Sequence, residues 1–91
     1  MIQKYLTSTN MKEKYHIGDR FKVKDEIYIL AQVGTNLFHL IGLDSGNRYS
    51  EPYRPRNKRS IIDGLSLSQI KNNMARKAVF HKKAEYRNQP L

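Results

Sequence analysis

Two apolar runs separated by a short turn constrain the fold of this chain more than any other feature. "EIYILAQV" covers residues 26–33, "LFHLIGL" covers residues 37–43, and the turn sequence "GTN" lies between them. Both runs are apolar at nearly every position, which is typical of strands covered on both faces. A sheet with one face exposed to solvent would instead carry polar residues at every second position. We therefore expect a small curled barrel, or a sheet with a helix packed over it.

The residues around these runs also predict β-structure. "RFKVK", residues 20–24, alternates polar and apolar positions, as a half-exposed strand does. "DSGN", residues 44–47, is a hairpin signal, because Gly and Asn tolerate the positive φ of tight turns. "RYSE", residues 48–51, predicts a short fourth strand that ends at Pro52. The alternation predicts two faces for residues 26–33, with Tyr28 and Leu30 on one and Ile27, Ile29, Ala31 and Val33 on the other.

The last third of the chain has helical spacing. An apolar stripe follows i, i+3, i+7 and i+11, and Ser66 or Ser68 is a natural N-cap. This pattern predicts one long helix over residues 65–89, with the stripe formed by Leu67, Ile70, Met74 and Ala78. The opposite face would then be basic with one aromatic side chain, and its members would be Arg76, Phe80, Lys83 and Arg87. Phe80 would pack on the sheet instead if the helix is rotated.

The fold class that follows is mainly β with a C-terminal α-helix, an α+β arrangement. We expect a small curled antiparallel sheet or barrel, followed by one long basic amphipathic helix. The chain has 91 residues, which argues for a single domain. Within it we expect an N-terminal arm over residues 1–16, a small β-barrel over 17–64 and the helix over 65–89.

Charge is distributed very unevenly along the chain. The formal net charge is +9. Residues 52–91 carry ten Lys and Arg against Asp63 and Glu85, which leaves +8 in this segment alone. Such segregation predicts a polyanionic partner, with nucleic acid the first candidate.

The sharpest signal within this segment is the loop 53–60, "YRPRNKRS". Four cations occur in six residues there with no acid among them: Arg54, Arg56, Lys58 and Arg59. Like charges repel one another, and the loop does not need them to fold. Lys and Arg neutralise phosphates, and nearby aromatic rings can stack on unpaired bases. The candidate binding residues are therefore these four cations and Tyr53, with Arg76, Phe80, Lys83 and Arg87 from the predicted helix, although charged helix faces are usually only solvated.

Several function classes find no support in the sequence. The chain has no cysteine, so disulfides and thiolate metal sites are excluded. Its three histidines are far apart, and no motif for a metal, a nucleotide phosphate or a catalytic nucleophile occurs. We therefore expect no metal site, no cofactor and no enzymatic activity. No apolar run approaches a membrane span, and the N-terminus lacks the apolar core of a secretion signal, so we expect a cytoplasmic protein.

The run from residue 17 to residue 52 resembles small Src-homology-3-like barrels, particularly short accessory proteins encoded by phages and mobile elements. The residues that carry the resemblance are the opening Gly18-Asp19-Arg20-Phe21, the apolar strand from Tyr28 to Val33, and the return from Gly46-Asn47-Arg48 to Pro52. This resemblance implies a cytoplasmic binding module without catalysis. It does not fix the ligand, because barrels of this type bind DNA, RNA or protein.

Two functional hypotheses remain open from the sequence. The first is a small basic protein that binds nucleic acid, or a nucleoprotein complex, mainly through phosphate contacts. The alternative is a phage-encoded inhibitor of the anti-CRISPR or anti-restriction type, or an adaptor, that binds a host nuclease or another nucleic-acid-handling protein. The sequence leaves open the choice between DNA, RNA and protein as ligand, and it leaves open the oligomeric state.

Overall fold

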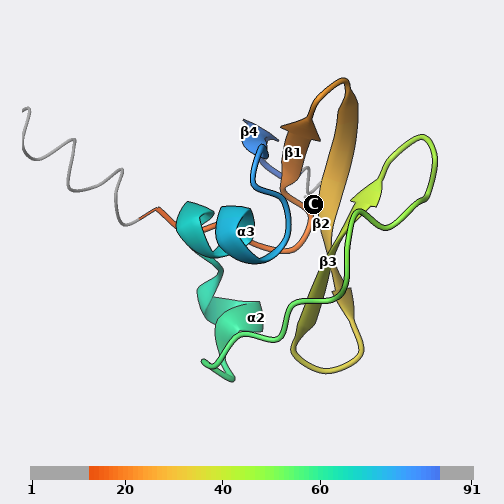
Figure 1. Cartoon of the computed structure of the whole chain (residues 1–91). Helices are drawn as coiled ribbons and strands as arrows, with labels where there is room; N and C mark the ends of the chain where they lie inside the picture. Colours follow the sequence, from red (N-terminus) through yellow and green to blue (C-terminus); the bar gives the residue numbers. More distant parts are fainter. Residues whose placement is uncertain (1–12, 85–91) are drawn as a thin grey trace, which may run out of the picture.

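A computed structural model describes residues 13–84 of the chain. These residues form a four-stranded antiparallel sheet with two short helices on one side of it (Figure 1). The strands lie in the order β3-β2-β1-β4. Their bounds are Arg20–Val23 for β1, Glu26–Val33 for β2, Leu37–Gly42 for β3 and Val79–Lys82 for β4. The helices are α2, Ser60–Asp63, and α3, Leu67–Asn73.

Strands β1, β2 and β3 form a meander joined by two tight turns. The register pairs Val23 with Glu26 across the first turn, and Val33 with Leu37 across the second. Asn36 has a φ of 73° in the second turn, a conformation that Asn tolerates better than most residues. The three predicted strands and the predicted turn at residues 34–36 are therefore confirmed.

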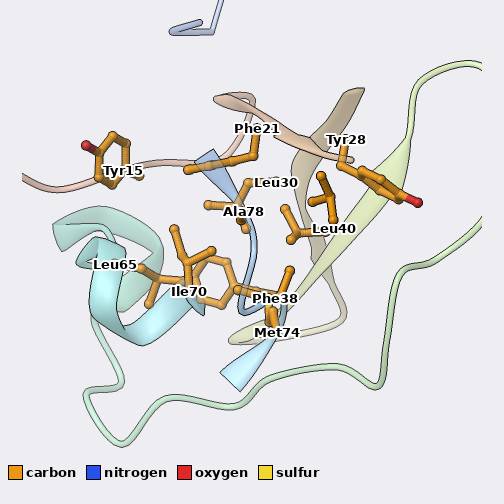
Figure 2. Packing of buried hydrophobic residues seen from close by; sticks show 12 residues of the cluster. Tyr15, Phe21, Tyr28, Leu30, Phe38, Leu40, Leu65, Ile70, Met74 and Ala78 are labelled. Carbon is orange, nitrogen blue, oxygen red and sulfur yellow. The ribbon is translucent and has the colours of Figure 1, made fainter. Parts of the chain in front are cut away.

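The core lies between one face of the sheet and the helices (Figure 2). The alternation predicted for β1 and β2 is confirmed, because Phe21 and Val23 are buried, and Tyr28 and Leu30 lie together on one face. The structure adds that this face of β2 is the one that points into the core. The opposite face of β2 carries half-buried apolar side chains. The helical layer and its flanks contribute Leu65, Ile70, Met74, Ala75 and Ala78 to the core.

The prediction of one long C-terminal helix is wrong. Helix α3 begins at a capping box, in which the Ser66 hydroxyl and the Gln69 side chain each accept a hydrogen bond from the other residue's backbone N–H. It ends at Asn73, and a turn leads into β4, which pairs antiparallel with β1. Asn is a poor helix former, and Val79 and Phe80 favour strands. Pairing also gives hydrogen-bond partners to the outer edge of β1, which a helix would not do.

The predicted strand at residues 48–51 is also wrong. This segment runs along the outer edge of β3 and makes only isolated contacts, with bridges from Arg48 to Ile41 and from Tyr53 to Phe38. The Tyr49 N–H donates to the Leu40 carbonyl at 2.8 Å. The fourth strand of the sheet comes from residues 79–82 instead. A sheet with two short helices thus replaces the expected sheet or barrel followed by a long helix.

The segment before β1 joins the core. Tyr15 is buried, and its backbone exchanges two hydrogen bonds with Leu65, at 2.7 and 2.8 Å. The Tyr15 ring lies 5.4 Å from the ring of Phe21. This residue lies within the span expected to be an N-terminal arm, and residues 1–12 of that span are outside the described residues.

Candidate polyanion-binding site

The backbone of the basic loop is fixed just before its first cation. Tyr53 and Phe38 exchange two backbone hydrogen bonds, each 2.9 Å long. The Tyr53 hydroxyl accepts a hydrogen bond from Nε2 of Gln69 in α3 at 3.3 Å. Pro55 is buried, so the chain is also held immediately after Arg54. Tyr53 therefore holds the loop between the sheet and α3, and its ring is half-buried rather than open to a ligand.

Three of the predicted cations surround one hollow of about 420 Å³. Arg54, Arg56 and Lys58 line it together with Pro55 and with two residues of the β2–β3 turn, Thr35 and Asn36. We call this group of six residues the basic hollow. The three cationic side chains are exposed, and none of them forms an ion pair within residues 13–84.

Arg59 is placed differently from the other three cations. Its Nε lies 3.8 Å from Oδ1 of Asp63, so part of its charge is balanced. Asn57 organises this end of the loop, because its Oδ1 accepts from the Arg59 N–H and its Nδ2 donates to Oδ2 of Asp63. Arg59 therefore belongs to the start of α2 rather than to the basic hollow.

The structure does not bring together the four residues predicted on the helix face, because the helix does not extend to them. Arg76 lies in the turn after α3. Phe80 lies in β4 and packs on the core, with its ring 5.1 Å from the Tyr15 ring and 5.9 Å from the Phe21 ring. Lys83 follows β4, and its Nζ lies 3.7 Å from Oε2 of Glu13. Arg87 is outside the described residues.

The structure adds Tyr49, which the predicted site does not include. Its side chain is 39% exposed, and its ring stands edge-to-face with the Tyr28 ring, 5.3 Å away. It lines a second hollow of about 390 Å³, which we call the Tyr49 hollow, with cations Lys71 and Arg76 and with Ser50, Glu51, Asn72, Asn73 and Met74. No sequence signal separates Tyr49 from Tyr53, since which of them reaches α3 is decided by tertiary packing.

Tyr49 also lines a hollow of opposite charge. It has a volume of about 560 Å³ and is lined by Asp25, Glu26 and Asp44, with one cation, Lys24, among the lining residues. The Tyr28 hydroxyl donates to Oε1 of Glu26 at 3.1 Å. Burial raises the pKa of Tyr28, and this hydrogen bond to the carboxylate raises it further. Tyr49 therefore lines both a hollow of net negative charge and one of net positive charge.

His39 is the least satisfied polar side chain near these surfaces. It is 2% exposed, and neither ring nitrogen has a hydrogen-bond partner. It lines a fourth hollow together with Arg48 and Glu51. Burial lowers the pKa of His39, the Arg48 charge lowers it further, and Glu51 acts in the opposite direction. The imidazole is therefore neutral at pH 7.

Neither a metal-binding cluster nor a membrane-spanning helix occurs in the described part of the chain. Residues 13–84 contain no group of three or more His, Asp or Glu side chains arranged to hold a metal ion. No helix between those limits is long and apolar enough to cross a membrane. Comparison of the chain with known proteins finds no matching family model, no matching curated protein and no matching solved structure.

Proposed function

We propose that this protein is a small nucleic-acid-binding protein that holds phosphate groups at the basic hollow and catalyses no reaction. The observation that carries the proposal is the convergence of Arg54, Arg56 and Lys58 on one hollow, without an acidic partner in the described part of the chain. Solvated cations on a surface usually spread apart or pair with acids, because grouped like charges repel one another. A bound polyanion removes that repulsion.

The chemistry of the three side chains suits phosphate. A guanidinium group presents a rigid fork of N–H donors that can hold two phosphate oxygens at once, and a Lys ammonium group adds a point charge. The buried Pro55 and the paired backbone of Tyr53 fix the loop before a ligand arrives. Less conformational entropy is therefore lost on binding than in a mobile basic tail.

Contacts of this kind give affinity without much sequence preference. Phosphate oxygens are the same at every nucleotide, so side chains that contact only them carry no direct sequence information. The net charge of +9 adds long-range attraction to any polyanion. We expect binding that is fast, weakly selective among sequences and strongly dependent on salt.

The test is a binding titration with labelled single-stranded and duplex DNA and RNA at two salt concentrations. It compares the full chain with the triple variant Arg54→Gln, Arg56→Gln, Lys58→Gln. The matched control is Lys14→Gln, Lys22→Gln, Lys77→Gln, which removes the same charge from three exposed residues that line no part of the basic hollow.

We expect binding that falls steeply with salt, falls by at least tenfold in the triple variant and changes little in the control. Equal losses in the two variants would mean that net charge alone drives binding, and that the basic hollow is not a site. Absence of binding to every nucleic acid at moderate salt would refute the proposal and would direct the search to proteins with an acidic surface.

A further inference from the structure

We infer that the ligand is single-stranded nucleic acid and that one of its unpaired bases stacks on the ring of Tyr49. This inference rests on the proposed function and specifies which form of nucleic acid the protein binds. It starts from the Phe and Tyr side chains. Most of those between residues 13 and 84 are buried or packed on the core, and Tyr49 alone among them is exposed.

The Tyr49 ring is held in place before any ligand binds. The backbone N–H of Tyr49 donates a hydrogen bond to the Leu40 carbonyl at 2.8 Å, which fixes the backbone position from which the side chain extends. The ring packs against Tyr28 with an interplanar angle of 87°. Tyr49 as a residue is still 39% exposed, so its fixed ring is a preformed platform for a flat partner.

The charges beside the ring favour a partner that carries phosphate. Lys71 and Arg76 line the Tyr49 hollow with it, against one acid, Glu51, so the lining keeps a net positive charge. The other hollow that Tyr49 lines carries Asp25, Glu26 and Asp44 against one cation, Lys24, and its net negative charge repels anions. A base stacked on Tyr49 would therefore have its phosphates on the side of Lys71 and Arg76. This pairing of an aromatic ring with cations is how proteins bind single strands without reading their sequence.

One strand can reach both hollows. Tyr49 and Arg54 are five residues apart on a segment that runs along β3, and an extended chain rises about 3.3 Å per residue. The Cα atoms of Tyr49 and Arg54 are thus at most about 17 Å apart. Successive nucleotides of a stacked strand rise about 3.4 Å, so about five nucleotides cover this separation. Every residue between them except Tyr53 is exposed.

A duplex can use the basic hollow but not the platform. Along the duplex its bases are paired and stacked on both faces, so a tyrosine ring can reach a base face only at the two ends or where the helix opens. We therefore expect the Tyr49 contact to separate single strands from duplexes, while the basic hollow contributes to the affinity for both.

The experiment measures the affinities of Tyr49→Ala and Tyr49→Phe for oligothymidylate, oligouridylate and a duplex of the same length. We expect Tyr49→Ala to weaken single-strand binding by about tenfold or more. Its affinity for the duplex should change by less than about twofold. Tyr49→Phe keeps the ring and should bind as the unchanged chain does. Oligothymidylate and oligouridylate differ in the thymine methyl group as well as in the sugar, so oligodeoxyuridylate is measured beside them to isolate the effect of the sugar.

A second measurement does not depend on an affinity. The chain contains no tryptophan, so Tyr49→Trp places one fluorescent reporter at the platform. We expect oligothymidylate to quench its fluorescence to saturation, because a stacked base contacts the indole ring. A thermal melt of each variant checks that the contact with Tyr28 is not needed for folding.

The outcomes separate this inference from the proposed function. If Tyr49→Ala leaves single-strand affinity unchanged, or weakens single strand and duplex equally, the inference is wrong. If the Tyr49→Trp variant shows no quenching while the oligonucleotide is bound, it is also wrong. In either case the loss of binding in the Arg54, Arg56 and Lys58 triple variant would still support the proposed function. Unchanged binding by that triple variant would instead refute the proposed function.

Discussion

The carboxylate of Asp19 joins two parts of the chain that are 65 residues apart, because its Oδ1 accepts the backbone N–H of Ala84 at 2.9 Å. Its Oδ2 accepts the backbone N–H of His16, also at 2.9 Å. Asp19 is only 3% exposed, so both bonds are shielded from water. One side chain thus joins the residues that follow β4 to the segment before β1.

The first prediction is that Asp19→Asn destabilises the fold by about 2–3 kcal/mol. The amide offers one acceptor oxygen and turns an NH₂ group toward the second N–H, and a hydrogen bond to a charged group contributes about 1.5–3 kcal/mol. Urea unfolding measures the change. Asp44→Asn is the control, because that side chain is exposed, and it should cost less than about 0.5 kcal/mol. Equal values for the two variants would show that the buried bonds contribute nothing.

The second prediction concerns Phe80, which the sequence indicates as a binding residue. Its ring packs against those of Tyr15 and Phe21, so Phe80→Ala should destabilise the protein by about 2–3 kcal/mol, somewhat less than a fully buried Phe. Nucleic-acid affinity below the unfolding transition should not change. The neighbouring Val79 is 61% exposed, and Val79→Ala should leave stability nearly unchanged. A loss of affinity without a loss of stability would instead show that Phe80 contacts the nucleic acid.

The sequence predicted those parts of the fold that local patterns decide. Strands β1 to β3 were predictable because alternation marks β1, apolar runs mark β2 and β3, and turn residues separate them. Tyr28 and Leu30 share one face of β2 as predicted, but only the structure shows that this face meets the core. Residues 74–82 were not predictable in the same way. Met74 and Ala78 are buried, as the helical spacing indicated, but they reach the core from the end of α3 and from the following turn. Pairing of β4 with β1 is a long-range contact, which no local pattern shows.

The same distinction between local patterns and long-range contacts applies to the candidate site. The loop cluster was visible because four like charges in six residues need no knowledge of the fold. The structure separates Arg59 from the other three through its contact with Asp63, which the i, i+4 spacing alone did not establish. The exposure of Tyr49 and the packing of Tyr53 depend on how residues 48–53 lie between β3 and α3. Only tertiary structure decides that.

The third prediction is a loss of stability in mild acid that depends on His39. Burial and Arg48 lower the pKa of His39 in the folded state from 6.5, so below about pH 6.5 the unfolded chain binds its proton first. The free energy of unfolding should therefore be highest above that pH and fall as pH decreases, by at most about 1.4 kcal/mol per pH unit from this group.

Urea unfolding of the unchanged chain and of His39→Leu across this pH range measures the effect. The leucine variant should show the shallower pH dependence, and the carboxylates common to both proteins cancel in the difference. At pH 7 it should be no less stable, because the substitution removes two ring nitrogens that have no hydrogen-bond partner. Parallel pH profiles would mean that His39 is protonated in the folded state as readily as in the unfolded chain.

The last prediction distinguishes the cations of the basic hollow by the salt dependence of binding. Each phosphate neutralised on a single strand contributes about −0.7 to the slope of log K against log salt concentration. If Arg54, Arg56 and Lys58 each engage one phosphate, their replacement by Gln should make that slope shallower by about 2. Arg59→Gln should change the slope by much less than the value of about 0.7 expected for one engaged phosphate, because Asp63 already balances part of the Arg59 charge. A slope that depends only on the number of charges removed, and not on their position, would show that the strand is held by the general field of the protein and at no defined site.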